Sequence, residues 1–74
     1  MKVIKDEIIR KKLSPQEDTV LKMYAKGNIA KQIANNLSIS ESTVKTYNQR
    51  ILAKLQANNI YHAIGIYAKA KLLN

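Results

Sequence analysis

The absence of cysteine most constrains how this 74-residue chain can fold. A chain without cysteine has no disulfide, no thiolate zinc site and no thiol nucleophile. A domain of this size buries only about 60% of the surface that its unfolded chain exposes, so its core alone gives marginal stability. An efficient helical core or a second copy of the chain must make up the difference. We therefore expect one small domain.

Start and stop signals predict an all-α domain of four core helices, at about residues 15–26, 29–37, 41–56 and 60–73. Each predicted start follows a residue that favours a helix N-cap, namely Ser14, Asn28, Ser40 and the pair Asn58–Asn59. Glu17 completes a capping box with Ser14, and Gly27 is suited to end the first helix. Residues 1–12 show no clean period, so we expect an N-terminal tail or docked segment ahead of the domain at residues 13–74.

Basic residues dominate the charge of the chain, with 13 Lys and Arg against five Asp and Glu, for a formal net charge of +8. All five acids lie within residues 1–41, so residues 42–74 carry bases alone. A basic domain with an acid-free half indicates a polyanionic partner, most often nucleic acid. A merely solubilising basic surface is the alternative interpretation.

The predicted helix at 41–56 has two faces of opposite character. At about 100° per residue, one face gathers the apolar side chains that must meet the core: Val44, Tyr47, Ile51 and Leu55. The opposite face, free of acids and of large apolar groups, holds Ser42, Thr46, Gln49 and Ala53, with Lys45 on its flank. Lysine, glutamine and threonine can bond to base edges, and Arg50 and Lys54 on the helix shoulder could reach phosphates.

A solvated polar helix face would look similar, but the preceding segment favours a helix-turn-helix. A short predicted helix is followed by a break that contains Ile39 and then by the longer helix. We expect the two helices to cross closely at Ala34, with the crossing sealed by Ile33, Leu37, Ile39, Val44 and Tyr47. In a helix-turn-helix the second helix of the pair enters the major groove of DNA.

The order and spacing of these motifs resemble the LuxR/NarL-type, GerE-like helix-turn-helix, which is the C-terminal domain of many bacterial response regulators. The resemblance covers residues 13–73. It is carried by Leu13-Ser14-Pro15-Gln16-Glu17 with Val20-Leu21, by Ile33-Ala34-Asn35-Asn36-Leu37, by Ile39-Ser40-Glu41-Ser42-Thr43-Val44-Lys45, and by Ile51, Lys54-Leu55, Asn59 and Ala63. It implies a four-helix fold that binds DNA.

The resemblance also implies which side chains meet DNA. The implied base contacts are Lys45, Thr46 and Gln49. The implied phosphate contacts are Lys31, Ser42, Thr43 and Arg50, and Lys54 joins them from its place on the helix shoulder.

Three residues depart from the family's pattern. Tyr47 stands where the family usually has histidine, and Gln56 stands where it commonly has glycine. Ile60 replaces a common arginine, which would weaken a salt bridge of the family for which Glu17 is the candidate acid.

The predicted last helix carries two apolar stripes, whereas the surface helix of a monomer needs only one. One stripe is expected to face the core: Ile60, Ala63, Ile66, Tyr67 and Ala70. The second has small residues at its centre and consists of Tyr61, Ile64, Gly65, Ala68 and Leu72. We predict that this second stripe forms a homodimer interface, as the last helix does in the family. Two recognition helices would then lie about 34 Å apart, on half-sites one DNA turn apart. The alternative is that the tail covers the stripe within one monomer, through Ile4, Ile8 and Ile9.

Neither an enzyme nor a metal or cofactor site is expected. His62 is the only histidine and lies between the two stripes of the last helix. The acidic residues are adjacent or at helix starts, so no nucleophile, base and orienting group can be assembled from them. No apolar run is long enough for a membrane span.

We therefore predict a bacterial transcriptional regulator that is cytoplasmic, nucleoid-associated when bound to DNA, and sequence-specific through residues 41–56 as a homodimer. RNA polymerase or another regulator is a further candidate partner. The length suggests a stand-alone effector domain, and Met1 favours a complete chain over an excised fragment. The main alternative is a small interaction protein that pairs with a larger regulator and modulates it. A basic amphipathic segment on anionic membranes is a weaker alternative.

Overall fold

The computed structural model describes residue 9 and residues 12–72, and within them four helices follow one another. They are α2 (Pro15–Ala25), α3 (Ala30–Leu37), α4 (Glu41–Leu55) and α5 (Ile60–Leu72). No strand occurs among the described residues. The predicted all-α class is confirmed, and each helix begins and ends within one residue of its predicted bound.

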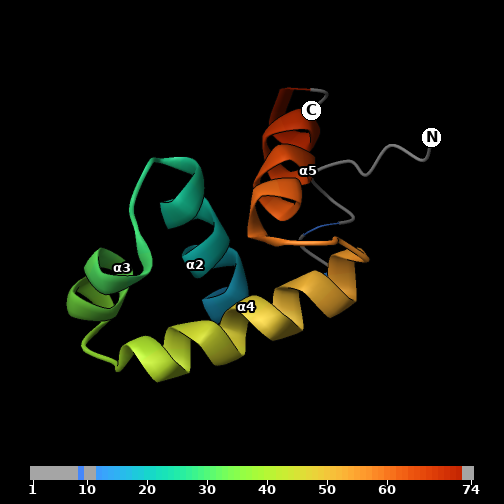
Figure 1. Ribbon diagram of the computed structural model, residues 1–74. Coiled ribbons are helices and arrows are strands. Elements are labelled where there is room, and N and C mark those ends of the chain that lie inside the picture. Colours follow the sequence, from blue (N-terminus) through green and yellow to red (C-terminus); the bar gives the residue numbers. More distant parts are fainter. Residues whose placement is uncertain (1–8, 10–11, 73–74) are drawn as a thin grey trace.

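The long helix α4 is the element on which the others are assembled (Figure 1). α2 and α5 stand on one side of α4, and α3 lies beside α2 near the start of α4. α2 begins close to α4, and its connection to α3 lies at the far end. α2 packs against all three other helices, and α4 also contacts α3 and α5. The other three helices therefore all lie on one side of α4. No helix in this part of the chain is long and apolar enough to cross a membrane.

The predicted caps explain why three of the helices begin where they do. The Ser14 side chain accepts from the Glu17 N–H at 3.2 Å, and Glu17 Oε1 accepts from the Ser14 N–H at 2.9 Å. Ser40 Oγ accepts from the Thr43 N–H at 3.0 Å, and Asn59 Oδ1 accepts from the His62 N–H at 2.8 Å. Each bond satisfies a backbone donor that has no partner inside its helix.

Asn28 does not cap the helix that follows it, so that prediction was wrong. The N-cap of α3 is Ile29, whose backbone N–H donates to Gln32 Oε1 at 2.9 Å. The Asn28 side chain points back to α2, where its Nδ2 donates to the Met23 carbonyl at 3.0 Å. The last carbonyls of a helix have no helical partner, and the Asn28 amide satisfies one of them. Its side chain therefore bonds to the last turn of α2 instead of capping α3.

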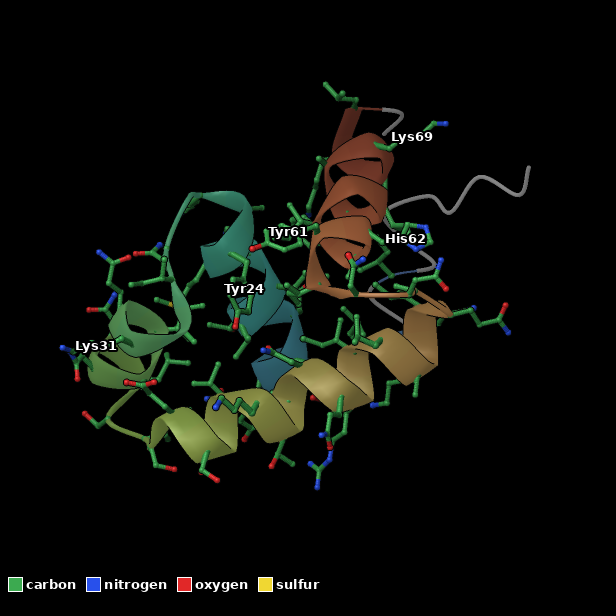
Figure 2. The ribbon with its side chains drawn as sticks, in the orientation of Figure 1. Tyr24, Lys31, Tyr61, His62 and Lys69 are labelled. Atoms are coloured by element: carbon green, nitrogen blue, oxygen red, sulfur yellow. The ribbon has the colours of Figure 1, made fainter. Side chains whose placement is uncertain are left out.

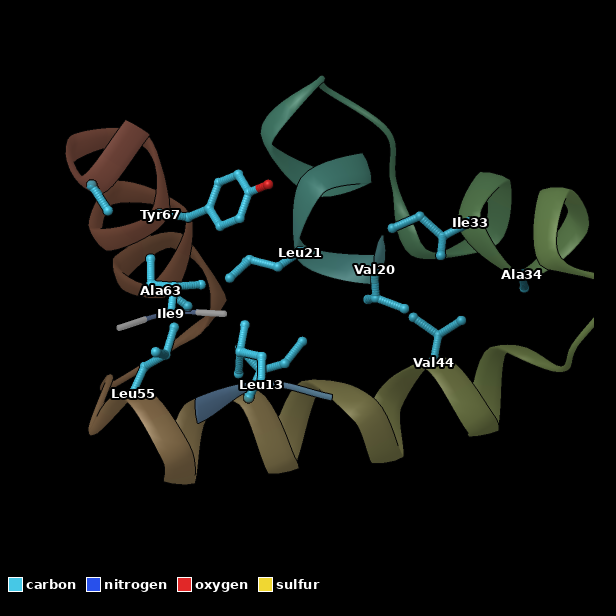
Figure 3. Packing of buried hydrophobic residues seen from close by; sticks show 12 residues of the cluster. Ile9, Leu13, Val20, Leu21, Ile33, Ala34, Val44, Leu55, Ala63 and Tyr67 are labelled. Atoms are coloured by element: carbon cyan, nitrogen blue, oxygen red, sulfur yellow. The ribbon is translucent and has the colours of Figure 1, made fainter. Parts of the chain in front are cut away.

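A single apolar cluster runs through the fold beneath α2 (Figure 3). At one end of it Val20, Ile33 and Val44 join the first three helices, and all three are fully buried. At the other end, where α5 lies, Figure 3 places Ile9 and Leu13 with a group from α2, α4 and α5 that includes Leu21, Leu55, Ala63 and Tyr67. Ile9 is fully buried in this cluster.

Ile9 does not cover the second stripe of α5, as the monomer alternative required, because it lies in the core with Ala63. Tyr61 and Leu72 of that stripe remain exposed. Ile4 and Ile8, the other two residues of that alternative, lie outside the described residues.

Among the residues that the structure describes, two other than glycine hold a left-handed backbone at helix ends. Ser38 ends α3 with a φ of 57°, and Gln56 ends α4 with a φ of 54°. Residues with a side chain adopt this conformation at some cost, which glycine avoids. The backbone at Gln56 therefore explains why glycine would suit that position.

Candidate nucleic-acid interface

The two faces of α4 are separated as its sequence predicts. Val44, Ile51 and Leu55 are buried, and Tyr47 is partly buried against the core. The opposite face is exposed along its length, at Ser42, Lys45, Thr46, Gln49 and Ala53. None of these side chains is needed for packing, so α4 offers solvent a continuous face that is polar and free of acids.

α3 and α4 form the predicted helix-turn-helix crossing. Ile33 is fully buried and Ala34 is 4% exposed, which leaves no room for a larger side chain at the crossing. Leu37, Ile39 and Tyr47 are partly buried and pack around it. The apolar contact fixes α3 across one end of α4 and leaves the outer face of α4 uncovered.

The three candidate base-contacting side chains, Lys45, Thr46 and Gln49, are all exposed on this face. The Thr46 hydroxyl donates to the Ser42 carbonyl at 3.2 Å. That bond directs the hydroxyl proton back to the helix, so the threonine presents an acceptor oxygen and a methyl group outward. A methyl group and an acceptor suit contact with a thymine methyl or a base amino group.

The candidate phosphate contacts lie at the start of that face and beside it. Lys31 points outward from α3 (Figure 2), and Ser42 and Arg50 are exposed on α4. Thr43 is partly buried, and its hydroxyl lies 2.9 Å from Ser40 Oγ at the start of the helix. These side chains surround the base-contacting candidates with hydroxyl and cationic groups, which are suited to phosphate oxygens.

Lys54, the fifth phosphate candidate, is engaged with an acid. Its Nζ lies 2.6 Å from Glu17 Oε1, and its side chain is 41% exposed whereas that of Glu17 is 3% exposed. Burial raises the pKa of Glu17, but the Lys54 ammonium and the Ser14 N–H outweigh it and hold that pKa below its ordinary value. With arginine absent at position 60, Lys54 is the cation that pairs with Glu17.

A second polar link from α2 to α4 escaped prediction. Asn48 Nδ2 donates to the Tyr24 hydroxyl at 2.8 Å, and both side chains are partly buried. Figure 2 shows Tyr24 in the space between α2 and α4. The periodicity of α4 places Asn48 at the edge of its buried face, but nothing in the sequence names Tyr24 as its partner.

The second stripe of α5 is largely uncovered within one chain. Tyr61 is 80% exposed and Leu72 is 85% exposed, and Gly65 and Ala68 are also exposed. Ile64 is partly buried against the core. The first stripe faces inward as predicted, with Ala63, Tyr67 and Ala70 buried and Ile60 and Ile66 partly buried.

An open groove of about 360 Å³ lies between α5 and the α2–α3 connection, beside the second stripe. Tyr61 and Ile64 line it from α5, and Figure 2 shows Tyr61 projecting from α5 on the side of α2. Ile29, which is 61% exposed, lines it from the α2–α3 connection. Apolar surface is therefore continuous from the stripe into the groove.

His62 takes part in the start of α5. Its Nδ1 accepts from the Asn58 N–H at 3.0 Å, so the ring supports the same turn that Asn59 caps. The described residues hold no group of three or more His, Cys, Asp or Glu side chains that could bind a metal ion.

Residues 11–67 match the family described as bacterial regulatory proteins, luxR family. The chain belongs to that family. The match spans all of α2, α3 and α4 and more than half of α5, so the whole helix-turn-helix lies within it. The resemblance carried by the helix starts and the α3–α4 crossing is thereby confirmed.

Several curated proteins are similar to the chain. A Pseudomonas aeruginosa protein named as a transcriptional regulator is 43% identical over 61 residues, which are 82% of this chain and 30% of that protein. BvgA of Bordetella pertussis, named as a positive transcription regulator of virulence factors, is 38% identical over 60 residues, or 81% of this chain and 29% of BvgA. The response regulator protein TodT of Pseudomonas putida is 36% identical over 59 residues, or 80% of this chain and 26% of TodT. The chain thus spans less than a third of the length of each of these relatives.

Proposed function

We propose that this chain is a transcription regulator that reads double-stranded DNA with the outer face of α4. The observation that carries the proposal is that exposed, acid-free face, fixed by a close α3–α4 crossing at Ala34. A helix so presented fits the major groove, which is wide enough for an α-helix and shows a distinct pattern for each base pair. The family and the names of the relatives support the same function.

In this proposal Lys45, Thr46 and Gln49 contact bases. Phosphates are contacted by Lys31, Ser42, Thr43, Arg50 and Lys54. Lys54 would share its ammonium between Glu17 and a phosphate, so we expect it to contribute less than Lys31 or Arg50. The net charge of +8 draws the chain to DNA in a bacterial nucleoid.

The chain acts as a homodimer through the second stripe of α5. The exposure of Tyr61 and Leu72 supports this, because a monomer gains nothing from two large apolar side chains in water. Gly65 and Ala68 between them would let two α5 helices approach closely. A two-fold dimer would place two copies of α4 on half-sites about 34 Å apart.

Selection from a pool of random DNA duplexes tests the function. The protein is mixed with the pool at about 150 mM salt, near physiological ionic strength, and the retained duplexes are sequenced. We expect enrichment of a two-fold symmetric motif with half-sites about one turn apart. Retention without enrichment, lost steeply as salt is raised, would mean that only charge attracts DNA and would contradict the proposal.

The same exposed stripe also favours a second candidate function, in which α5 pairs with a larger regulator and modulates it. Tyr61, Leu72 and the neighbouring groove would then receive a helix of that regulator instead of a second copy of the chain. Sedimentation of the chain alone, together with the selection experiment, distinguishes the two functions. Self-association supports the homodimer, and a monomer that enriches no DNA site supports the interaction protein. RNA polymerase or another regulator remains a proposed further partner of the DNA-bound homodimer.

A further inference from the structure

The hydrogen bond between Tyr24 and Asn48 joins α2 to α4, the helix whose outer face is proposed to meet DNA. Its donor and acceptor are 2.8 Å apart, and the two residues are 24 positions apart in the chain. Within residues 12–72, one other side-chain hydrogen bond joins α2 to α4, the ion pair between Glu17 and Lys54. Both links start on α2, one near its beginning and one near its end.

The two links lie on opposite sides of the apolar seam of α4. At about 100° per residue, the seam of Val44, Ile51 and Leu55 falls between Asn48 on one side and Lys54 on the other. Apolar contacts are non-directional and tolerate a small rotation of the helix about its axis. A hydrogen bond is directional and weakens over a few tenths of an ångström. Two such bonds on either flank therefore resist a roll of α4 in both senses.

A small roll would matter at the outer face. Side chains reach about 5–6 Å from the axis of a helix, so a roll of about 20° would move their ends by about 2 Å. A base contact that has the geometry of a hydrogen bond does not survive such a displacement. Phosphate contacts through long, flexible side chains would adjust to it.

Asn48 also leaves a buried polar atom without a hydrogen bond, which lowers stability. Its Oδ1 is buried and has no hydrogen-bond partner within the described part of the chain. An apolar side chain of the same shape would avoid that cost, since an unpaired buried carbonyl is unfavourable. We therefore attribute to the Asn48 amide a role in orienting α4, through the direction of its bond to Tyr24, and not a gain in stability.

We infer that Tyr24 and Asn48 are positioning residues that set the roll of α4, and with it the discrimination between DNA sequences, without touching DNA. The inference rests on the proposed function, because it concerns how well bases are read. In this inference, affinity for DNA of any sequence depends on the charged side chains. Discrimination between sequences also depends on the Tyr24–Asn48 hydrogen bond, which lies on the core side of α4.

The test compares the wild-type chain with the double variant Tyr24→Phe/Asn48→Leu. Removing both polar partners leaves no unpaired group, so we expect the double variant to fold with stability close to wild type. On the site that selection enriches, we expect the ratio of specific to random-DNA affinity to fall by about tenfold, the scale of one lost base contact. The salt dependence of binding to random DNA should not change, because every phosphate contact is kept.

Thr19→Val is the matched control. Its hydroxyl also lies on α2 but donates to the Pro15 carbonyl at 2.9 Å within the same helix. This variant should keep the wild-type ratio. A double variant that is folded and keeps the wild-type ratio would overturn the positioning role and leave the proposed function intact. A wild-type chain that enriches no sequence would overturn both.

A second measurement detects a rotation of α4 about its own axis in the absence of DNA. Because the chain has no cysteine, spin labels can be attached at Lys22→Cys on α2 and Ala53→Cys on the outer face of α4. Pulsed electron resonance then gives the distance distribution between the labels. We expect the distribution to shift or broaden when Tyr24→Phe/Asn48→Leu is added. An unchanged distribution would contradict the inference.

Discussion

At the scale of single residues, the exposed side chains of α4 fall into two proposed groups, those that contact bases and those that contact phosphates. Gln49 has an amide that can bond to adenine in two places, so its contribution depends on the base that it meets. Arg50 is exposed on the shoulder of the same helix, and in the proposed complex it would meet a phosphate whatever the sequence. Both are exposed and neither packs against the core, so both can be changed without unfolding the domain.

Gln49→Ala and Arg50→Ala should therefore weaken DNA binding in different ways. Gln49→Ala, like Lys45→Ala, should cost about 1–3 kcal/mol at the selected site and relax specificity there. Arg50→Ala, like Lys31→Ala, should weaken all sequences alike and lower the slope of log affinity against log salt by about one. Titrations of cognate and random duplexes at several salt concentrations measure both effects. Equal losses on the two duplexes for Gln49→Ala would remove it from the base-contacting set.

Gln56 offers a residue-scale prediction about stability. Its φ of 54° costs a residue with a side chain about 1–2 kcal/mol, and glycine would avoid this cost. Part of that stabilisation would be lost again, because glycine has more conformational entropy in the unfolded chain. Gln56→Gly should therefore raise the free energy of unfolding by about 0.5–1 kcal/mol, measured by urea denaturation. Ala53→Gly, at an exposed position inside α4, is the control and should lower it by about 1 kcal/mol. A loss of stability in Gln56→Gly would show that the Gln56 side chain contributes more than its backbone costs.

At the scale of helices, the sequence predicts an element wherever a short-range signal exists. The capping box at Ser14, the cap at Ser40 and the periodicity of α4 are all local, and the bounds of the helices followed from them to within one residue. Asn28 was misassigned because an asparagine side chain can satisfy either the helix behind it or the one ahead. The core partners of Ile9 and the Tyr24–Asn48 bond were out of reach, since each contact joins residues distant in the chain and neither leaves a periodic trace.

The link between α2 and α4 through Glu17 makes stability depend on pH. The folded-state pKa of Glu17 is lowered, so its contribution is complete above the unfolded value of about 4.3 and is lost as pH falls toward the folded value. Glu17→Gln should therefore lower the free energy of unfolding at neutral pH, and the difference from wild type should shrink in acid. Urea denaturation from about pH 7 to about pH 3 checks this.

Lys54→Met is the companion variant, because it removes the ammonium that holds down the pKa of Glu17 while keeping the aliphatic stem. The wild-type dependence on pH should weaken in this variant. For a pair whose lysine is 41% exposed, we expect a loss of about 1 kcal/mol at neutral pH. An unchanged pH profile would show that the Ser14 N–H alone holds the carboxylate.

The exposed stripe of α5 can be tested at the scale of that helix. A Cβ atom at Gly65 would meet no atom within 4 Å, and the position is exposed, so Gly65→Asp should leave the fold of one chain intact. It would place a charge in the proposed interface, as would Ala68→Glu, and we expect each variant to be a folded monomer with much weaker DNA binding. Sedimentation equilibrium and circular dichroism check the two parts. Ala53→Glu, on the exposed face of α4, should leave self-association unchanged, and a dimeric Gly65→Asp would rule out the interface.

At the scale of the whole molecule, a net charge of +8 acts on the two proposed associations with opposite sign. Two copies of the chain repel each other, whereas each copy is attracted to DNA. Raising the salt concentration from about 50 mM to about 200 mM should tighten the homodimer by screening and weaken DNA binding by orders of magnitude. Sedimentation and duplex binding over the same range measure the two trends. A homodimer weakened by salt would mean that specific ion pairs, and not the apolar stripe, hold it together.

Ile9 and Leu13 share a core with Ala63 and Tyr67, and this has a consequence for how the protein is made. A ribosome releases the chain from its amino end, so Ile9 and Leu13 leave the exit tunnel while their partners on α5 have yet to be synthesised. The order of synthesis is the reverse of what the packing needs. Until α5 emerges, Ile9 and Leu13 lack their partners Ala63 and Tyr67, so we expect the core to close only late in synthesis.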